Sequence, residues 1–486
     1  MKIIVLYDDT IPKSEAITDI IGDRGFADVV VRKKRLEDYY HNEVEKIYSG
    51  LIWKKIHSVF EYADLIKFLE LYNGEDVKIL HCFANYLISD SDKVTLSYKK
   101  LLYIEEPFAV VASKRGEVAA VMFPCVNPYI AFCKTIMSGQ KVHDAAKNLK
   151  ESFEIEGLID IGKIGNFIQC ITGNFDSRYF NSLQENEYTL QKSSTNKKKI
   201  KSEYSFYHLL PEDMKYWFVM PFNYHESENI ASYTMERLHI PDLAIKWVHG
   251  SIDEMEFAEL LDKYFFFFKN RHSKECTVAE YNEVADALYI NKVNDRIAEL
   301  KNLPEYIKIQ KFLAASDGLN IDILVAKYFK LKSKIESRID YPKLSVIGHG
   351  DPCFANALYS KVTKTLKFID PKGALTEADL WTNPYYDIAK LSHSICGRYD
   401  FFNNGLYDIR VDDKFAYDLD IPFDNTKYIR IFKDKVEGNG FDYLSVRIYE
   451  ASLFLSMLPL HIDNPHKVFG FILNVNNIIK EIESNV

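Results

Sequence analysis

Two short polar segments, each beside an apolar run, contain the residue types that phosphoryl transfer requires. Residues 346–356 read VIGHGDPCFAN, and residues 366–373 read LKFIDPKG. A carboxylate such as Asp351 can orient a substrate hydroxyl and accept its proton, while Asn356 and Asp370 offer oxygen ligands for the Mg²⁺ ions that bridge ATP phosphates. One loop can present both Asp351 and Asn356, and an apolar strand can hold Asp370 rigidly.

These segments resemble the catalytic and metal loops of the aminoglycoside phosphotransferase and choline kinase family, relatives of the protein kinases. The match is HGDxxxxN followed by a strand that ends in IDxxG. The resemblance implies that Asp351 is the catalytic base, that Asn356 and Asp370 bind Mg²⁺, and that His349 orders the loop. It also matches Asp387 to a family aspartate that supports this loop. Each residue alone could be an ordinary turn or cap residue, but their order and flanks favour the functional interpretation.

A kinase-like domain also needs an upstream nucleotide-binding lobe, and the preceding residues supply candidates. A strand is expected over residues 187–193, where it carries Lys192, and the helix that follows carries Glu203. A strand lysine and a helix glutamate in this order suit the ion pair that places a lysine on ATP phosphates. The alternative for Lys192 is a solvated strand lysine.

Residues 171–180 lie where the resemblance expects a phosphate-covering hairpin. The segment contains a single glycine, so phosphate contacts would come from Thr172, Ser177 and backbone N–H groups. A plain hairpin turn is an equal alternative. Residues 233–238 resemble the family's hinge, whose backbone binds adenine, and we therefore expect Met235, Glu236 and Leu238 in the nucleotide site; an ordinary edge strand is the alternative.

The acceptor is expected between the catalytic loop and the helical lobe, because the family places it there. Glu377, Asp379, Trp381, Tyr385 and Tyr386 combine carboxylates with aromatic rings, as a pocket for an ammonium or a sugar would. Aromatic residues make up 14% of the chain, so such a cluster is more often part of the core.

The elements that must position these residues change in character along the chain. Short β-like pieces surround one helical segment over residues 165–220, and long helical periodicity begins near residue 254. We predict an α+β, protein-kinase-like bilobal domain, with a small β-rich lobe over residues 160–250 and a large helical lobe over residues 251–486.

Residues 1–150 alternate strands with helices and predict a separate α/β domain. Residues 77–90 faintly resemble the nucleotide-sugar-binding domain of sugar nucleotidyltransferases. Such an enzyme needs a glycine-rich basic loop after the first strand, where this chain has DDTIP, and a metal-binding aspartate after the middle strand, where it has CFA. We therefore predict a degenerate domain for binding or scaffolding. Asp8, Asp9, Asp90 and Asp92 could bind a cation, although loop and cap roles are commoner.

Composition excludes several classes of function. The 486 residues predict two or three domains, and seven scattered cysteines indicate free thiols rather than a zinc site or disulfide scaffold. A net charge of −9 with one short basic cluster excludes a nucleic-acid footprint. No apolar stretch reaches membrane-spanning length, and the start MKIIVLYDD lacks the pattern of a signal peptide. We expect a cytoplasmic protein.

The combined prediction is an ATP- and Mg²⁺-dependent kinase that phosphorylates a hydroxyl of a small molecule, namely a sugar, an amino sugar or an amino alcohol. Fusion to a sugar-nucleotide-like region associates it with cell-surface polysaccharide metabolism. Two alternatives stay open: a pseudokinase-like module that binds nucleotide without transfer, and a bifunctional kinase and nucleotidyltransferase. The sequence leaves the acceptor's identity and the oligomeric state undetermined.

Overall fold

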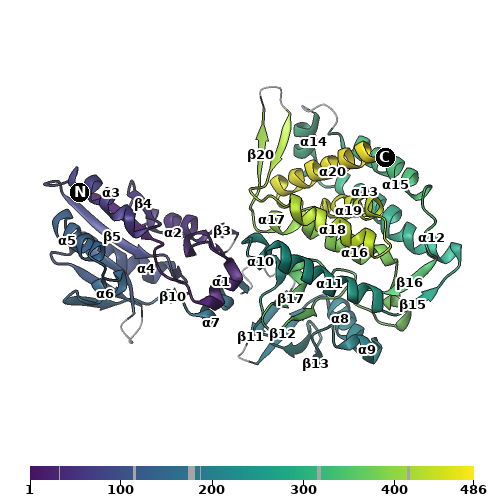
Figure 1. Ribbon diagram of the computed structural model, residues 1–486, viewed down its shortest axis with the longest axis horizontal. Helices are drawn as coiled ribbons and strands as arrows, with labels where there is room; N and C mark the ends of the chain where they lie inside the picture. Colours follow the sequence, from purple (N-terminus) through teal and green to yellow (C-terminus); the bar gives the residue numbers. More distant parts are fainter. Residues whose placement is uncertain (32, 113–116, 173–180, 186–187, 315–318, 413–415) are drawn as a thin grey trace. The chain divides into compact units, whose positions relative to one another are not determined.

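The computed structural model describes residues 1–31, 33–112, 117–172, 181–185, 188–314, 319–412 and 416–486. The chain divides into two compact units, Met1–Gly173 and Asn174–Val486 (Figure 1). Residues 160–172, which the sequence analysis assigned to the nucleotide-binding lobe, therefore fold with the first unit. Within the described ranges, no helix has the length and apolar character of a membrane span.

A six-stranded mixed sheet forms the centre of the first unit, in the order β4-β1-β5-β8-β7-β9. Strand β1 is parallel to both β4 and β5, β8 is antiparallel to its two neighbours, and β9 is parallel to β7. Strands β1, β5 and β8 are almost entirely buried, which explains their apolar runs. The strands are β1 (Lys2–Asp8), β4 (Ile52–Ile56), β5 (Val77–Phe83), β7 (Phe108–Val111), β8 (Val118–Phe123) and β9 (Glu151–Glu154).

Short elements complete this unit, and one of them corrects the sequence analysis. Residues 165–172 were expected to be β-like and to lead into a hairpin, but they belong to helix α7 (Ile164–Thr172). Phe167 and Cys170, both buried, are three residues apart, which is helical spacing. The other elements are α1 (Glu15–Ile21), β2 (Val30–Val31), β3 (Lys34–Arg35), α2 (Leu36–Glu45), α3 (Tyr62–Glu70), β6 (Tyr86–Ile88), α4 (Ser91–Tyr98), α5 (Val126–Met137), α6 (Val142–Lys147) and β10 (Leu158–Asp160).

The second unit begins with a small antiparallel sheet in the order β11-β12-β14-β13, packed against helix α8 (Lys197–Leu209). The Asn196 side chain caps α8 by accepting the N–H of Lys199. Ile200 of α8 packs with Tyr233 and Met235 of the sheet. We call these elements the sheet region: β11 (Asn181–Glu185), β12 (Thr189–Ser194), α8, α9 (Glu212–Lys215), β13 (Pro221–Glu226) and β14 (Ala231–Glu236).

Backbone hydrogen bonds join the sheet region to the hairpin of β17 (Ala357–Ser360) and β18 (Thr365–Phe368). The N–H of Phe368 donates to the carbonyl of Trp217 at 2.7 Å, and the N–H of Val219 donates to the carbonyl of Phe368 at 3.1 Å. We call this contact the seam. It holds residues 217–219, just before β13, beside the strand that leads to Asp370.

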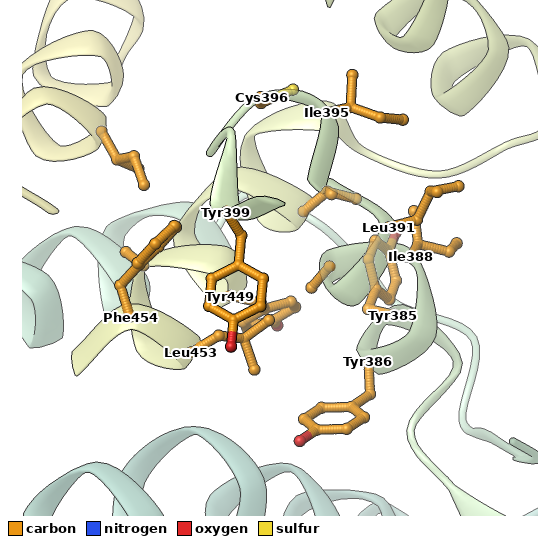
Figure 2. Packing of buried hydrophobic residues seen from close by; sticks show 14 of the residues in the cluster. Tyr385, Tyr386, Ile388, Leu391, Ile395, Cys396, Tyr399, Tyr449, Leu453 and Phe454 are labelled. Atoms are coloured by element: carbon orange, nitrogen blue, oxygen red, sulfur yellow. The ribbon is translucent and has the colours of Figure 1, made fainter. Parts of the chain in front are cut away.

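The rest of the second unit, the helical region, is built around helix α19, which is buried along nearly its whole length. Helices α15, α16 and α20 pack against it, and Figure 2 shows residues of α16 and α19 that form this core. The helices are α10 (Leu243–Val248), α11 (Glu254–Asn270), α12 (Val278–Asp286), α13 (Lys292–Lys301), α14 (Tyr306–Ala314), α15 (Ile321–Glu336), α16 (Pro384–Ile395), α17 (Tyr399–Asn403), α18 (Thr426–Gly438), α19 (Tyr443–Met457) and α20 (Pro465–Asn485). The short strands are β15 (Ser273–Glu275), β16 (Leu344–Ile347), β19 (Trp381–Thr382), β20 (Asp408–Val411) and β21 (Tyr417–Asp420).

Candidate active site

The loop that follows β16 is held by one carboxylate from the first turn of α16. Asp387 accepts the backbone N–H of His349 at 2.9 Å and that of Gly350 at 2.8 Å. Gly350 has φ +84°, and a Cβ there would lie 2.6 Å from the Cβ of Lys372. The turn at residue 350 therefore requires glycine, and the two loop N–H groups require the hydrogen-bond acceptor that Asp387 provides.

A buried arginine balances the charge of Asp387. The Nη1 atom of Arg271, at the end of α11, lies 2.7 Å from Oδ2 of Asp387, and both side chains are almost completely buried. Nη2 of Arg271 also donates to the carbonyl of Pro384. Arg271 was not predicted from the sequence, because no local pattern identifies a counterion that lies 116 residues from the buried acid.

His349 occupies the centre of the loop and is fully buried against the Phe218 ring, with centroids 5.8 Å apart and planes 9° apart. Its Nδ1 accepts the N–H of Asp351 at 3.0 Å, so its Nε2 carries the proton and donates to the carbonyl of Ile369 at 2.9 Å. Burial lowers the pKa of His349, which keeps the ring neutral in this role. His349 thus positions Asp351.

Asp351 is the acidic residue of this loop, and 38% of its side chain is exposed. Lys390 of α16 lies 3.1 Å from its Oδ1. Burial alone would raise the pKa of Asp351, but Lys390 lowers it below the ordinary value, so the carboxylate is ionised at neutral pH. Lys390 was missed, although it stands three residues after Asp387 on one face of a helix.

Lys192 joins the sheet region to the segment after β18. Its Nζ lies 2.8 Å from Oε2 of Glu203 and 2.8 Å from Oδ1 of Asp370. Burial alone would lower the pKa of Lys192, but Asp370 and Glu203 raise it above its ordinary value. The structure therefore brings together the expected strand lysine, helix glutamate and loop aspartate.

The residues expected to hold Mg²⁺ have a suitable chemistry. Nδ2 of Asn356 donates to the carbonyl of Asp351 at 2.9 Å, which leaves its amide oxygen as a ligand. Asp370 is 41% exposed, and the N–H of Ile369 donates to the carbonyl of Asn356 at 3.0 Å, so the two segments are neighbours. The described residues contain no group of three or more His, Cys, Asp or Glu side chains that could hold a metal alone. Two oxygen ligands fit Mg²⁺, which also takes water and phosphate oxygens.

The segment after Asp370 is tied to the helix that carries Glu203. The N–H of Ala374 donates to the carbonyl of Ser202 at 2.9 Å. Gly373 has φ +87°, and a Cβ there would lie 2.4 Å from Oγ of Ser202. This close approach requires glycine and fixes the Asp370 segment against α8.

A pocket beside Asp370 contains one of the expected adenine-binding residues. Met235 lines it from β14, together with Glu203 of α8. Glu236 is exposed at the end of β14, and Leu238 follows the strand and is half-buried. Ser177 lies outside the described residues. Thr172 ends helix α7 of the first unit, and the hairpin expected after it lies outside the described residues.

None of the five residues expected at the acceptor is among the described residues that line the pocket containing Asp351. Tyr386 accepts a hydrogen bond from Lys292, which does line that pocket. Glu377 and Asp379 are exposed in a short 3₁₀ turn, where Asp379 caps Thr376. Trp381 lies in β19 under the ammonium of Lys274. Tyr385 is 4% exposed in the core, where its ring packs edge-on against Tyr341, Phe441 and Tyr449. Their closeness in sequence to Asp370 did not predict closeness to Asp351.

The pocket at Asp351 is built from helices distant in sequence. It has a volume of about 190 Å³. None of Glu377, Asp379, Trp381 and Tyr385 is among its described lining residues, which are Lys292, Asp351, Lys390, His393, Tyr399, Leu453, Ser456, Met457, Leu460 and His461.

In the first unit, Asp8 is a core residue rather than a loop ligand. It is fully buried and accepts hydrogen bonds from Tyr62 at 2.8 Å and from His81 at 3.0 Å. Tyr129 lies 2.9 Å from the other ring nitrogen of His81. Asp90 caps α4 by accepting the N–H of Lys93. The cap role weighed for Asp90 is therefore what the structure shows.

Comparison with known proteins adds structural neighbours only. No protein-family model matches the chain, and no match to a curated protein was found. Among solved structures, a thermostable mutant of aminoglycoside phosphotransferase APH(4)-Ia in its apo form is 13% identical, over 62% of this chain and 94% of that chain, with a TM-score of 0.35. A ternary complex of such a mutant with ADP and hygromycin B is 13% identical over 63% and 94%, with a TM-score of 0.34. TM-scores of this size establish neither a fold nor a function, so the chemistry must be argued from the site itself.

Proposed function

We propose that the second unit is a bilobal kinase that transfers the γ-phosphate of ATP to a hydroxyl group of a small molecule, with Mg²⁺ as cofactor. The observation that carries the proposal is the meeting of two constellations. One is Lys192 with Glu203 and Asp370, and the other is the loop of Asp351 and Asn356. Phosphoryl transfer is catalysed by positioning and by charge stabilisation, and these groups supply both.

Each residue has one role in this proposal. Lys192 binds ATP phosphates and is aimed by Glu203. Asn356 and Asp370 would hold the Mg²⁺, which would supply positive charge at the phosphates. Asp351 accepts the hydrogen bond of the acceptor hydroxyl and then its proton, while His349 and Asp387 fix the loop. Because the pKa of Asp351 is lowered, the carboxylate is ionised and can accept this hydrogen bond.

The acceptor class follows from the same chemistry. The proposed reaction needs an alcohol group, and sugars, amino sugars and amino alcohols all present one. The first unit would bind or scaffold, and a place in cell-surface polysaccharide metabolism is part of this proposal. The nucleotide-binding module without transfer is the competing function.

The experiment is ATP consumption with Mg²⁺ against sugars, amino sugars, amino alcohols and nucleosides. Asp351→Asn should lower turnover about 10²- to 10⁴-fold, because it removes the proton acceptor while keeping the shape. The matched control is Asp434→Asn, which alters an exposed aspartate on α18 and should leave turnover unchanged. Turnover that survives in Asp351→Asn would contradict the assigned base, and ATP binding without turnover on any acceptor would support the binding module.

A further inference from the structure

The pocket at Asp351 carries an excess of positive charge. Its charged lining groups are the ammonium groups of Lys292 and Lys390 and the single carboxylate of Asp351. Lys390 is paired with Asp351 at 3.1 Å, so these two charges largely cancel. The ammonium group of Lys292 therefore supplies the remaining positive charge of the pocket.

Lys292 lies at the start of α13 and is held by a phenol rather than by an acid. Its Nζ donates to the hydroxyl of Tyr386 at 3.0 Å and lies 5.5 Å from the centre of that ring. Within the part of the chain that the structure describes, no carboxylate forms an ion pair with Lys292. Burial alone would raise the pKa of Tyr386, but Lys390 and Lys292 lower it below its ordinary value, as expected for a phenol beside two ammonium groups.

A second polar group faces the same pocket without charge. His393 is 1% exposed, stacks on Tyr399 with ring centroids 4.2 Å apart, and its Nε2 has no hydrogen-bond partner among the described residues. Burial, together with Lys390, lowers the pKa of His393 well below its ordinary value. The neutral ring can therefore bond a ligand hydroxyl.

We infer that the acceptor is a polyhydroxylated compound that carries a carboxylate, and that Lys292 binds this carboxylate. The inference rests on the proposed function and narrows its acceptor class. An amino sugar or amino alcohol would bring an ammonium against Lys292 and Lys390, with no carboxylate free to receive it, so the pocket disfavours cationic acceptors.

The transfer itself is unchanged by this choice. The acceptor oxygen bonds to the γ-phosphorus, the bond from that phosphorus to the β,γ-bridging oxygen breaks, and ADP leaves with the electron pair. The hydroxyl proton passes to Asp351. Lys292 only positions the acceptor, so its loss should act on the acceptor's KM more than on kcat or the KM of ATP.

The test compares matched hexose, hexosamine and uronic acid in the gluco and galacto configurations, with binding to the full chain measured by calorimetry without nucleotide. The uronic acid should bind about tenfold more tightly than the hexosamine. Lys292→Gln should remove that advantage and leave the neutral hexose within about twofold. Lys330→Gln, an exposed lysine on α15, is the charge-matched control and should leave every affinity unchanged.

Equal or tighter binding of the hexosamine overturns the inference, as does a preference that survives in Lys292→Gln or a uronic acid that does not bind. These results are distinct from a failure of the proposed function. An absence of ATP turnover with every acceptor would reject the kinase while the binding order still decides the pocket's charge preference. Turnover restricted to amino sugars would support the kinase and reject the inference.

Discussion

Replacing Asp387 with asparagine should destabilise the second unit strongly, although the two side chains have nearly the same size. The carboxylate accepts two backbone N–H groups of the loop and pairs with Arg271. An asparagine keeps one acceptor oxygen, and its NH₂ group would face a donor. The substitution therefore leaves one loop N–H unsatisfied and the guanidinium of Arg271 buried without a counterion.

The magnitude follows from burial. Because both side chains are almost fully buried, removing one partner of the ion pair costs about 3–5 kcal/mol. The unsatisfied N–H adds about 1–3 kcal/mol. A total of roughly 5 kcal/mol corresponds to a fall in Tm of about 10 °C or more for a unit of this size.

Tryptophan fluorescence can follow the unfolding, because Trp217, Trp247 and Trp381 report on the second unit and Trp53 on the first. Thermal unfolding of Asp387→Asn should show the loss in the second unit alone. The control Asp434→Asn removes an exposed charge and should leave Tm unchanged. In a double-mutant cycle, the loss of unfolding free energy caused by Arg271→Met should be about 3 kcal/mol smaller in the Asp387→Asn variant than in the wild type. Strictly additive effects, or a Tm for Asp387→Asn within about 2 °C of wild type, would refute the reasoning.

Three further changes probe other parts of the site. Lys192→Met should lower kcat/KM for ATP about 10²- to 10³-fold, because it removes the cation proposed to bind the phosphates. Coupled detection of ADP release measures this effect, and unchanged kinetics would disprove the proposed role of Lys192. Gly373→Ala should lower the free energy of unfolding, measured in urea, by about 1–3 kcal/mol because Gly373 has a φ of +87° and lies close to Ser202. In the control Gly438→Ala, the added Cβ would meet nothing within 4 Å, so the free energy of unfolding should not fall. Burial raises the pKa of Asp400 to about 7 from an ordinary 3.8, so the folded state retains a proton that the unfolded chain has released. The free energy of unfolding should therefore fall as the pH rises between these two pKa values. Asp400→Asn should raise the free energy of unfolding by up to about 4 kcal/mol at about pH 8 but change it little near pH 4. Equal effects at both pH values would contradict this prediction.

The local elements around the site were predictable because short-range patterns determine them. The apolar runs before His349 and Asp370 form β16 and β18, and the strand and helix that carry Lys192 and Glu203 form β12 and α8. β16 and β18 are short apolar runs that end in polar residues, and α8 begins at a capping asparagine, so these signals lie within a few neighbouring positions.

The long-range partners were not predictable in this way. Arg271 reaches Asp387 across 116 residues, and the pocket at Asp351 takes side chains from α13, α16, α17 and α19. Nothing near Lys292 in the sequence indicates that it will line the same pocket as Asp351. The boundary of the second unit was placed too early because the apolar residues of α7 were interpreted as strand residues.

The segment around Asp370 is fastened on both sides by backbone hydrogen bonds. Toward the sheet region, the seam joins Phe368 to Trp217 and Val219, and the N–H of Ala374 donates to the carbonyl of Ser202 on α8. Toward the loop of Asp351, the N–H of Ile369 donates to the carbonyl of Asn356, and the N–H of Lys372 donates to the carbonyl of His349. A rotation that separates the sheet region from this loop would have to break one of these two sets of bonds. The main chain on either side of Asp370 therefore resists such a rotation, and the spacing of Lys192, Asp370 and the Asp351 loop does not depend on side-chain contacts alone.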